Sequence, residues 1–496
     1  MSRLLLLGLL ILSVLNGFCM DKEENNLVLH YQAETRASFA GGANTPFWLI
    51  SNIRGLGSPE FNNGYVKGGI FKYSDSDTYK KFDWAAGIEL AGAWNLPSPF
   101  SIRQLYGEIR YRKLKISLGS KNFKSYFNDI DLSTGDLLFS GNAPAIPQLR
   151  IGTDGFAPFW GTQGWLSVKA YLAYGFFTDS KWVKDWVVDG GDYASDVLFC
   201  SRGVWAGIGN LSKFPLQLHV GIEMATQFGG KVFKDGKFIK MPTDFKAWIK
   251  AFIPSAGDSS TPVEEQTNVQ GNMNGEYVFS LTWIPKKEWK VRAYFEHYFE
   301  DHSQMFLQYG LWKDGLWGLE VSFPSNKFLD KILFEYISTY DQTGSVNHDI
   351  TEAIPEQVSG RDNYYTHYLY GAWQNWGMTI GTPLAISPIY NRNHVMTIYD
   401  NRFTATHFGL QGSPLKELKW RLLMTFSRNW GTYIRPFSHR CDNFSGFFEI
   451  TGKLPRLKGW EIKGALALDH GSLFGGNFGG MVSLAYEGNF SIKTKR

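Results

Sequence analysis

The chain has 496 residues, of which 16% are aromatic and 19% charged, and its mean hydropathy is -0.22. Its 50 basic and 46 acidic side chains leave a net charge of +4, which excludes a strongly basic nucleic-acid-binding protein. Three cysteines are too few for a disulfide-built scaffold, and the sequence leaves open whether Cys200 and Cys441 pair.

The N-terminus has the pattern of a secretory signal peptide. Arg3 precedes an apolar stretch from Leu4 to Leu15, and small residues at the cleavage positions end at Cys19. A lipoprotein signal acylated at Cys19 is disfavoured because a large Phe precedes it, and an uncleaved anchor would need roughly 20 apolar residues. We therefore predict a signal peptide over residues 1–19, which is cleaved on export.

Apolar and polar side chains alternate with period two along the whole chain. From Trp289 to Phe299, mostly apolar side chains at odd positions alternate with polar or amphipathic ones. Similar stretches run from Leu166 to Leu172, from Leu216 to Met224 and from Glu461 to Asp469. This alternation predicts half-buried strands with one apolar face, and no later apolar run is long enough to cross a bilayer as a helix.

Aromatic residues at the ends of the predicted strands favour a membrane barrel over a soluble β-sandwich. Tryptophans resembling the interfacial girdles of membrane barrels occur as Trp84 and Trp94, Trp283 and Trp289, and Trp420 and Trp430. The 496 − 19 = 477 residues after the signal peptide give about 16 to 20 strands, at roughly 25 residues per strand with its connection. We predict an all-β fold in which residues 20–496 form a single domain, a transmembrane antiparallel β-barrel in the outer membrane of a Gram-negative bacterium.

Three turn-rich stretches between the predicted strands are expected to form long surface loops, near residues 185–195, 254–274 and 341–363. The stretch from Asn122 to Gln148 mixes aromatic, apolar and acidic residues without strand alternation. Such a stretch cannot face lipid with unpaired backbone groups. We expect this short irregular or helical segment to fold inward and plug or cap the lumen.

The C-terminus departs from the usual end of such barrels, which is an aromatic residue in the last strand. Here a basic tail follows Ile492. Either Phe490 or Ile492 closes the barrel with the tail beyond it, or the closing strand ends earlier.

Sequence motifs of known enzyme classes are missing. There is no Gly-x-Ser-x-Gly elbow, no His-Glu-x-x-His, no Cys-x-x-Cys and no phosphate-binding glycine loop. His297 and His302 are the nearest approach to a metal pair, and carboxylates such as Glu108, Glu223 and Glu296 fit the polar lining of a wide lumen. We expect no catalytic site, metal or cofactor.

Three stretches resemble a known family. The first runs from Ser140 to Gly152, followed by Gly161 to Leu166; the second joins Asp362–His367, Gly371–Trp373 and Gly381–Leu384; the third runs from Asn401 to Gly412. Together they resemble the capsule-assembly Wzi family, in its longer members. The sequence departs from that pattern at Ala405–His407, where a paired histidine is expected.

The resemblance implies an outer-membrane barrel that acts as a surface lectin and helps to assemble or retain capsular or extracellular polysaccharide, without enzymatic activity. The expected partners are that polysaccharide and outer-membrane lipid, with a monomer favoured and no nucleic acid. A diffusion porin for small solutes or oligosaccharides and an outer-membrane hydrolase remain as alternatives.

The sequence predicts two groups of site residues. In the first stretch, prolines cannot donate to a strand ladder, so a structural role is expected for Asn142, Pro144, Pro147, Gln148 and Arg150. Sugar rings stack on aromatic side chains while their hydroxyls bind amides and carboxylates, which predicts polysaccharide contacts. The predicted contacts are Tyr364, Tyr365, Trp373, Gln374, Asn375 and Trp376, with Trp312 and Trp317 as a second platform. Trp373 and Trp376 also suit a membrane girdle at one rim.

Overall fold

The computed structural model describes residues 27–74, 81–123, 128–255, 270–300, 305, 313–324, 328–348 and 358–492. The predicted signal peptide and the basic tail lie outside these residues.

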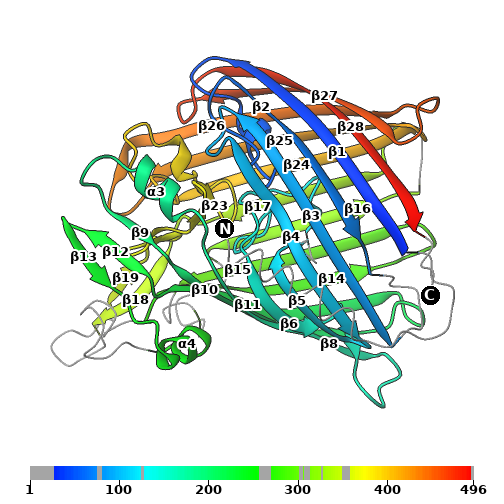
Figure 1. Cartoon of the computed structure of the whole chain (residues 1–496), viewed down its shortest axis with the longest axis horizontal. Coiled ribbons are helices and arrows are strands. Elements are labelled where there is room, and N and C mark those ends of the chain that lie inside the picture. Colours follow the sequence, from blue (N-terminus) through cyan, green and yellow to red (C-terminus); the bar gives the residue numbers. More distant parts are fainter. Residues whose placement is uncertain are drawn as a thin grey trace.

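Within the described residues, eighteen antiparallel strands close into one barrel (Figure 1). In order around the barrel they are β1 (Leu27–Gly41), β2 (Asn62–Lys72), β3 (Phe82–Trp94), β4 (Phe100–Tyr111), β5 (Leu114–Ser120), β6 (Gln148–Thr153), β8 (Leu166–Phe176), β10 (Leu198–Ile208), β11 (Leu216–Phe228), β14 (Asn272–Trp283), β15 (Lys290–Glu300), β16 (Gly315–Ser322), β17 (Lys331–Ser338), β24 (Phe403–Leu415), β25 (Leu418–Gly431), β26 (Pro436–Lys453), β27 (Trp460–Gly471) and β28 (Asn477–Ile492). The last strand pairs with the first, with Leu27 opposite Ile492. The predicted barrel is confirmed, and its closing strand ends at Ile492.

The two ends of the barrel differ in their connections. At the short-turn end lie the start of β1, the end of β28 and tight connections such as the one from β24 to β25. There β7 (Ala157–Pro158) pairs antiparallel with the start of β8. At the long-loop end the connections carry α3 (Ser180–Trp186), β9 (Tyr193–Ser195), β12 (Lys231–Lys234), β13 (Lys237–Lys240), α4 (Phe245–Phe252), β18 (Thr343–His348) and β19 (Val358–Arg361). Figure 1 shows these elements gathered at one mouth.

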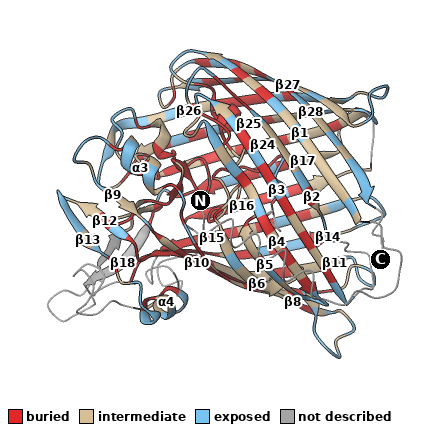
Figure 2. Ribbon diagram, viewed as in Figure 1, coloured by how far each residue is buried: buried red, intermediate tan, exposed pale blue. Residues whose placement is uncertain are grey.

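The alternation of each strand sorts its side chains between lumen and outer wall. On β17, Leu333 and Glu335 are fully buried, whereas Phe334 and Tyr336 between and beside them are exposed on the outside. Figure 2 shows the same alternation of buried and exposed residues along the strands. Period two therefore puts an apolar face toward lipid and a mixed face toward the lumen.

Three segments fold into the barrel and pack against the long-loop half of its wall. The first inner segment, residues 42–61, contains α2 (Phe47–Ile50), and the second is residues 128–147. The third, residues 363–402, contains β20 (Thr366–His367), β21 (Gly371–Ala372), β22 (Gln374–Asn375), β23 (Met378–Thr379) and the 3-10 helix η1 (Pro388–Tyr390). Leu132, Leu137 and Leu138 of the second segment are fully buried, so the predicted inward fold is confirmed.

Carboxylates on the lumen wall hold the second inner segment. We call Glu276, Glu296 and Glu335, on β14, β15 and β17, the wall carboxylates. Glu276 accepts the backbone N–H of Leu138 at 2.9 Å, and Glu296 accepts that of Leu137 at 2.9 Å. Glu335 accepts the backbone N–H of Thr134 at 2.9 Å, and the hydroxyls of Thr134 and Ser133 at 2.7 and 2.6 Å. These bonds satisfy irregular backbone that a strand ladder cannot reach.

Toward the short-turn end the lumen wall carries ion pairs between neighbouring strands. Examples are Lys67 with Glu34 at 3.0 Å, Arg292 with Glu320 at 2.7 Å and Arg421 with Glu449 at 2.9 Å. The attraction within each pair offsets part of the desolvation cost of placing charged side chains on the lumen wall. Cys200 and Cys441 are both free thiols, so the bridge that the sequence left open does not form. None of the helices in the described residues is long and apolar enough to cross a membrane.

Replacing Glu335 by Ala should loosen the second inner segment. Each hydrogen bond to a charged acceptor contributes about 1.5–3 kcal/mol, so we expect the free energy of unfolding to fall by about 3 kcal/mol or more. The measurements are urea unfolding of the purified barrel in detergent and hydrogen exchange of the amides at 132–138. Glu417→Ala, on the exposed turn between β24 and β25, is the control. Unchanged protection of those amides in Glu335→Ala would contradict this account.

Candidate functional site

Parts of the three stretches that carry the family resemblance meet inside the barrel, whereas Gly161 to Leu166 lie in the connection that leads into β8. Asn142 is fully buried, and its amide nitrogen donates to the Thr379 carbonyl at 3.0 Å and lies 3.3 Å from the Ser387 hydroxyl. Its amide oxygen accepts the backbone N–H of Asn52 at 3.3 Å. Asn142 therefore joins the second inner segment to both of the others.

The third stretch is attached to the second in the same way. The Asn401 amide nitrogen donates to the Asn363 side chain at 2.7 Å and to the Tyr364 carbonyl at 2.6 Å. His407 on β24, where the sequence departs from the family pattern, lies 2.7 Å from the Leu132 carbonyl and 2.8 Å from the Thr425 hydroxyl. These contacts place the resembling stretches in the packing of the interior.

Three of the predicted sugar contacts belong to the packed interior. Tyr364, Tyr365 and Trp373 are all 0% exposed. The Trp373 indole N–H donates to the Leu138 carbonyl at 3.3 Å, and the Tyr365 hydroxyl donates to the Leu137 carbonyl at 2.9 Å. These rings therefore do not form the exposed stacking platform that the sequence suggested, because their faces pack against other side chains.

The other predicted contacts of this stretch mostly hold the loop in shape. Gln374 is buried and its amide donates to the Asp179 carboxylate at 3.1 Å, which also accepts the Trp376 backbone N–H at 3.0 Å. Asn375 is buried and donates to the Pro144 carbonyl at 3.1 Å. Burial raises the pKa of Asp179 above its usual value, against the lowering effect of these bonds. Trp376 alone is half-buried, and its ring centroid lies 6.1 Å from that of Trp182.

Of the two tryptophans of the second predicted platform, only one lies within the described residues. Trp317 lies on the outer face of β16, with ring centroids 5.1 Å from Phe295 and 5.7 Å from Tyr336. It belongs to the lipid-facing wall and therefore does not form the predicted sugar platform. Trp312 lies outside the described residues.

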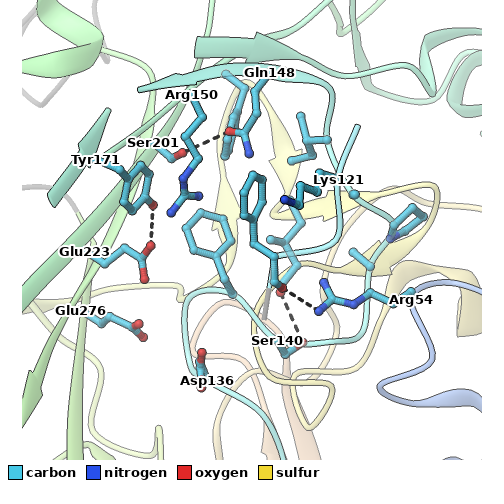
Figure 3. A pocket seen from close by; sticks show the side chains of 18 of the residues that line it. Arg54, Lys121, Asp136, Ser140, Gln148, Arg150, Tyr171, Ser201, Glu223 and Glu276 are labelled. Carbon is cyan, nitrogen blue, oxygen red and sulfur yellow. Dashed lines mark hydrogen bonds between the residues drawn. The ribbon is translucent and has the colours of Figure 1, made fainter. Parts of the chain in front are cut away.

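Three of the remaining motif residues, Pro144, Gln148 and Arg150, line a pocket of about 120 Å³ inside the barrel (Figure 3). The Arg150 guanidinium lies 3.4 Å from the ring centroid of Tyr171 and 4.2 Å from that of Phe123. Gln148 lies 3.5 Å from the Ser201 hydroxyl, and the Pro147 carbonyl accepts the backbone N–H of Phe176 at 3.2 Å.

Figure 3 shows acidic and basic groups on facing sides of this pocket. Glu223 and Glu276 come from the strand wall, whereas Arg54 and Lys121 come from the inner segments and their approach. The Tyr171 hydroxyl donates to Glu223, and Arg54 donates to the Phe123 carbonyl at 2.8 Å. The pocket is mixed in charge and small.

A larger cleft of about 590 Å³ opens at the long-loop end; we call it the mouth cleft. Its lining includes Tyr368, Tyr399, Arg361, Arg435 and Asn363. Tyr368 is 55% exposed, with the Lys234 ammonium 4.5 Å from its ring centroid. Exposed aromatic faces beside guanidinium, carboxylate and amide groups are the chemistry that binds sugar rings and hydroxyls.

Local sequence patterns indicate one edge of this cleft but not the rest. Asp362 and Asn363, which begin the second resembling stretch, line it, but Tyr368 and Tyr399 were not singled out. A signal was present at Tyr368, which lies between the resembling segments at 362–367 and 371–373. Arg435 and Lys234 come from other loops, so no spacing in the sequence connects them to the site.

The histidine of the mouth cleft keeps one charge state near neutral pH. His367 lines the cleft, and its Nδ1 accepts the backbone N–H groups of Leu369 and Tyr370 at 3.1 and 3.3 Å. Burial lowers the pKa of His367 to about 4, so the ring is neutral above about pH 5. In the part of the chain that the structure describes, no group of three His, Cys, Asp or Glu side chains could hold a metal ion.

Comparison with known proteins supports the fold. No family model matches the sequence, and no curated protein is similar to it in sequence. Among solved structures, the chain is similar to Wzi of Escherichia coli, an outer-membrane protein involved in group 1 capsule assembly and described as a carbohydrate-binding β-barrel. The TM-score is 0.57 at 11% identity, covering 94% of this chain and 85% of Wzi.

Two further structures also match. OprD of Pseudomonas aeruginosa has a TM-score of 0.45 at 9% identity, covering 93% of this chain and 95% of OprD. OmpT of Vibrio cholerae has a TM-score of 0.36 at 8% identity, covering 95% and 100%. At such low identity the likeness to Wzi shows the fold alone. The chain has the fold of a large outer-membrane β-barrel.

The burial of Trp373 leads to a stability prediction. Removing a fully buried Trp side chain leaves a cavity, so Trp373→Ala should lower the free energy of unfolding by about 3–5 kcal/mol. Trp376→Ala, at the half-buried neighbour, should cost much less. Urea unfolding of both variants in detergent measures the difference. Equal losses for the two variants would show that Trp373 is not a core residue of the interior.

Proposed function

We propose that this protein is an outer-membrane barrel that binds capsular or extracellular polysaccharide at its mouth cleft and helps to retain it at the cell surface. Short turns of bacterial barrels face the periplasm and long loops face outward, which places the mouth cleft on the cell exterior. The exposed Tyr368 among Arg361, Arg435 and Asn363 is the observation that carries the proposal.

The packing of the inner segments favours binding over permeation. The three inner segments pack against the long-loop half of the wall in one apolar cluster. A solute diffusing from the mouth cleft would meet this cluster before it reached the rest of the lumen. The proposal therefore needs no open pore, and it agrees with the carbohydrate binding described for Wzi, whose fold this chain shares.

A repeating polymer compensates for weak contacts at one cleft. Each barrel would hold one short portion of the chain, and many barrels on one cell would hold the same polymer together. Simultaneous attachment raises the overall affinity by orders of magnitude over that of one site. Retention at the surface therefore requires only modest affinity at each mouth cleft.

Replacing Tyr368 and Arg435 together by Ala should weaken binding of the host strain's own surface polysaccharide about tenfold, or about 1.4 kcal/mol, because a stacking face and a hydroxyl-binding cation are lost. Binding is measured with the purified barrel on immobilised polysaccharide. Tyr336→Ala, on the outer wall, is the matched control and should bind as the wild type does.

The outcomes separate the alternatives. Wild-type binding that the double variant retains would remove the mouth cleft as the site. Failure of the wild-type protein to bind, together with large and steady conductance in planar bilayers, would favour a diffusion porin instead.

A further inference from the structure

Helix α4 lies against the outside of the barrel near the long-loop end. It begins after Asp244, whose carboxylate accepts the backbone N–H of Ala247 at 2.9 Å and so caps the helix. Ala247 and Ala251, one helical turn apart, form its buried face. The Tyr174 hydroxyl of β8 donates to the Trp248 carbonyl at 2.8 Å, which fixes the helix to the wall.

The wall beneath α4 is a lipid-facing surface that the helix covers. Val204 and Ile208 show which face of β10 is outward, because both are 49% exposed. Cys200 has the same parity and is fully buried, in one apolar cluster with Phe228, Ala247 and Ala251. At this position the helix occupies the place that lipid takes elsewhere on the wall.

The outer face of α4 is apolar as well. Phe245 is 79% exposed, Ile249 45% and Phe252 42%, and Ile253 continues the run. Figure 2 shows exposed surface on α4, which lies at the outside of the barrel. Large apolar side chains gathered on an exposed face usually mark an interaction surface.

The height of α4 along the barrel axis indicates which surroundings its outer face meets. Tyr174 is eight residues above Leu166, the first residue of β8 at the short-turn end. At about 3.3 Å per residue and a tilt of about 40°, Tyr174 lies roughly 20 Å higher along the barrel axis. The apolar band of such barrels is about 25 Å tall, so α4 lies at its upper boundary.

We propose that α4 is an interfacial helix whose Phe245, Ile249 and Phe252 enter the acyl chains of the outer leaflet. The helix surface is continuous with the apolar outer wall, since Leu172, Tyr174 and Leu198 pack against the same cluster. An amphipathic helix at this depth binds lipid through its buried apolar area. This role does not depend on polysaccharide binding.

A nitroxide spin label at position 249 tests the proposal in proteoliposomes. The mature chain carries Ile249→Cys in a Cys441→Ser background, with the buried Cys200 retained. Collision rates with oxygen, which concentrates in lipid, are compared with those of a water-soluble nickel complex. Leu466→Cys on the outward face of β27 is the lipid control, and Ile434→Cys in a long-loop-end turn is the water control.

We expect the label at 249 to behave like the one at 466, with oxygen collisions several-fold above nickel collisions. A label that behaves like the one at 434 would overturn the proposal. Shielding from both reagents would also overturn it, since a second copy of the chain or another protein would then cover α4. Phe252→Cys gives a second labelling position if Ile249→Cys does not fold, and heat-modifiable gel migration verifies folding.

Discussion

The hydrogen bonds from the inner segments to the wall carboxylates are the constraint on which the interior depends. A segment that enters a closed barrel loses water and has no strand ladder to pair with, so its backbone N–H groups need other acceptors. Glu276, Glu296 and Glu335 supply these acceptors. They bind the backbone N–H groups of Leu138, Leu137 and Thr134, respectively. Burying three acidic side chains is costly, and these hydrogen bonds offset that cost.

The rest of the interior is assembled on this base. The second inner segment presents the carbonyls of Leu137 and Leu138, which accept the Tyr365 hydroxyl and the Trp373 indole. Glu300 accepts the Tyr365 backbone N–H at 2.5 Å, which holds Tyr365 at a φ of +63°, a left-handed conformation that few residues other than glycine adopt. The third inner segment is thereby fixed, and the mouth cleft is formed on its outward side.

The two faces of the wall use one strand pattern for different purposes. Inside, polar residues bind the inner segments and one another; outside, apolar residues meet lipid or α4. The aromatic residues divide in the same way. Trp373 fills the interior, Trp317 lies on the outer wall, and Tyr368 is exposed at the mouth, although all three are aromatic side chains with similar preferences for burial.

The sequence by itself determined the barrel, because period-two alternation and strand-end aromatics are local patterns that any strand crossing a membrane must show. It also predicted that the segment from 122 to 148 folds inward, since irregular backbone cannot face lipid, and the described residues 128–147 do so. Only the tertiary structure decided which aromatic residues are exposed. Tyr364 and Tyr368 are four residues apart, yet one is buried beneath Asn401 and the other lies beside Lys234 at the mouth. Burial at each position depends on loops that are distant in the sequence, and no local pattern records their meeting.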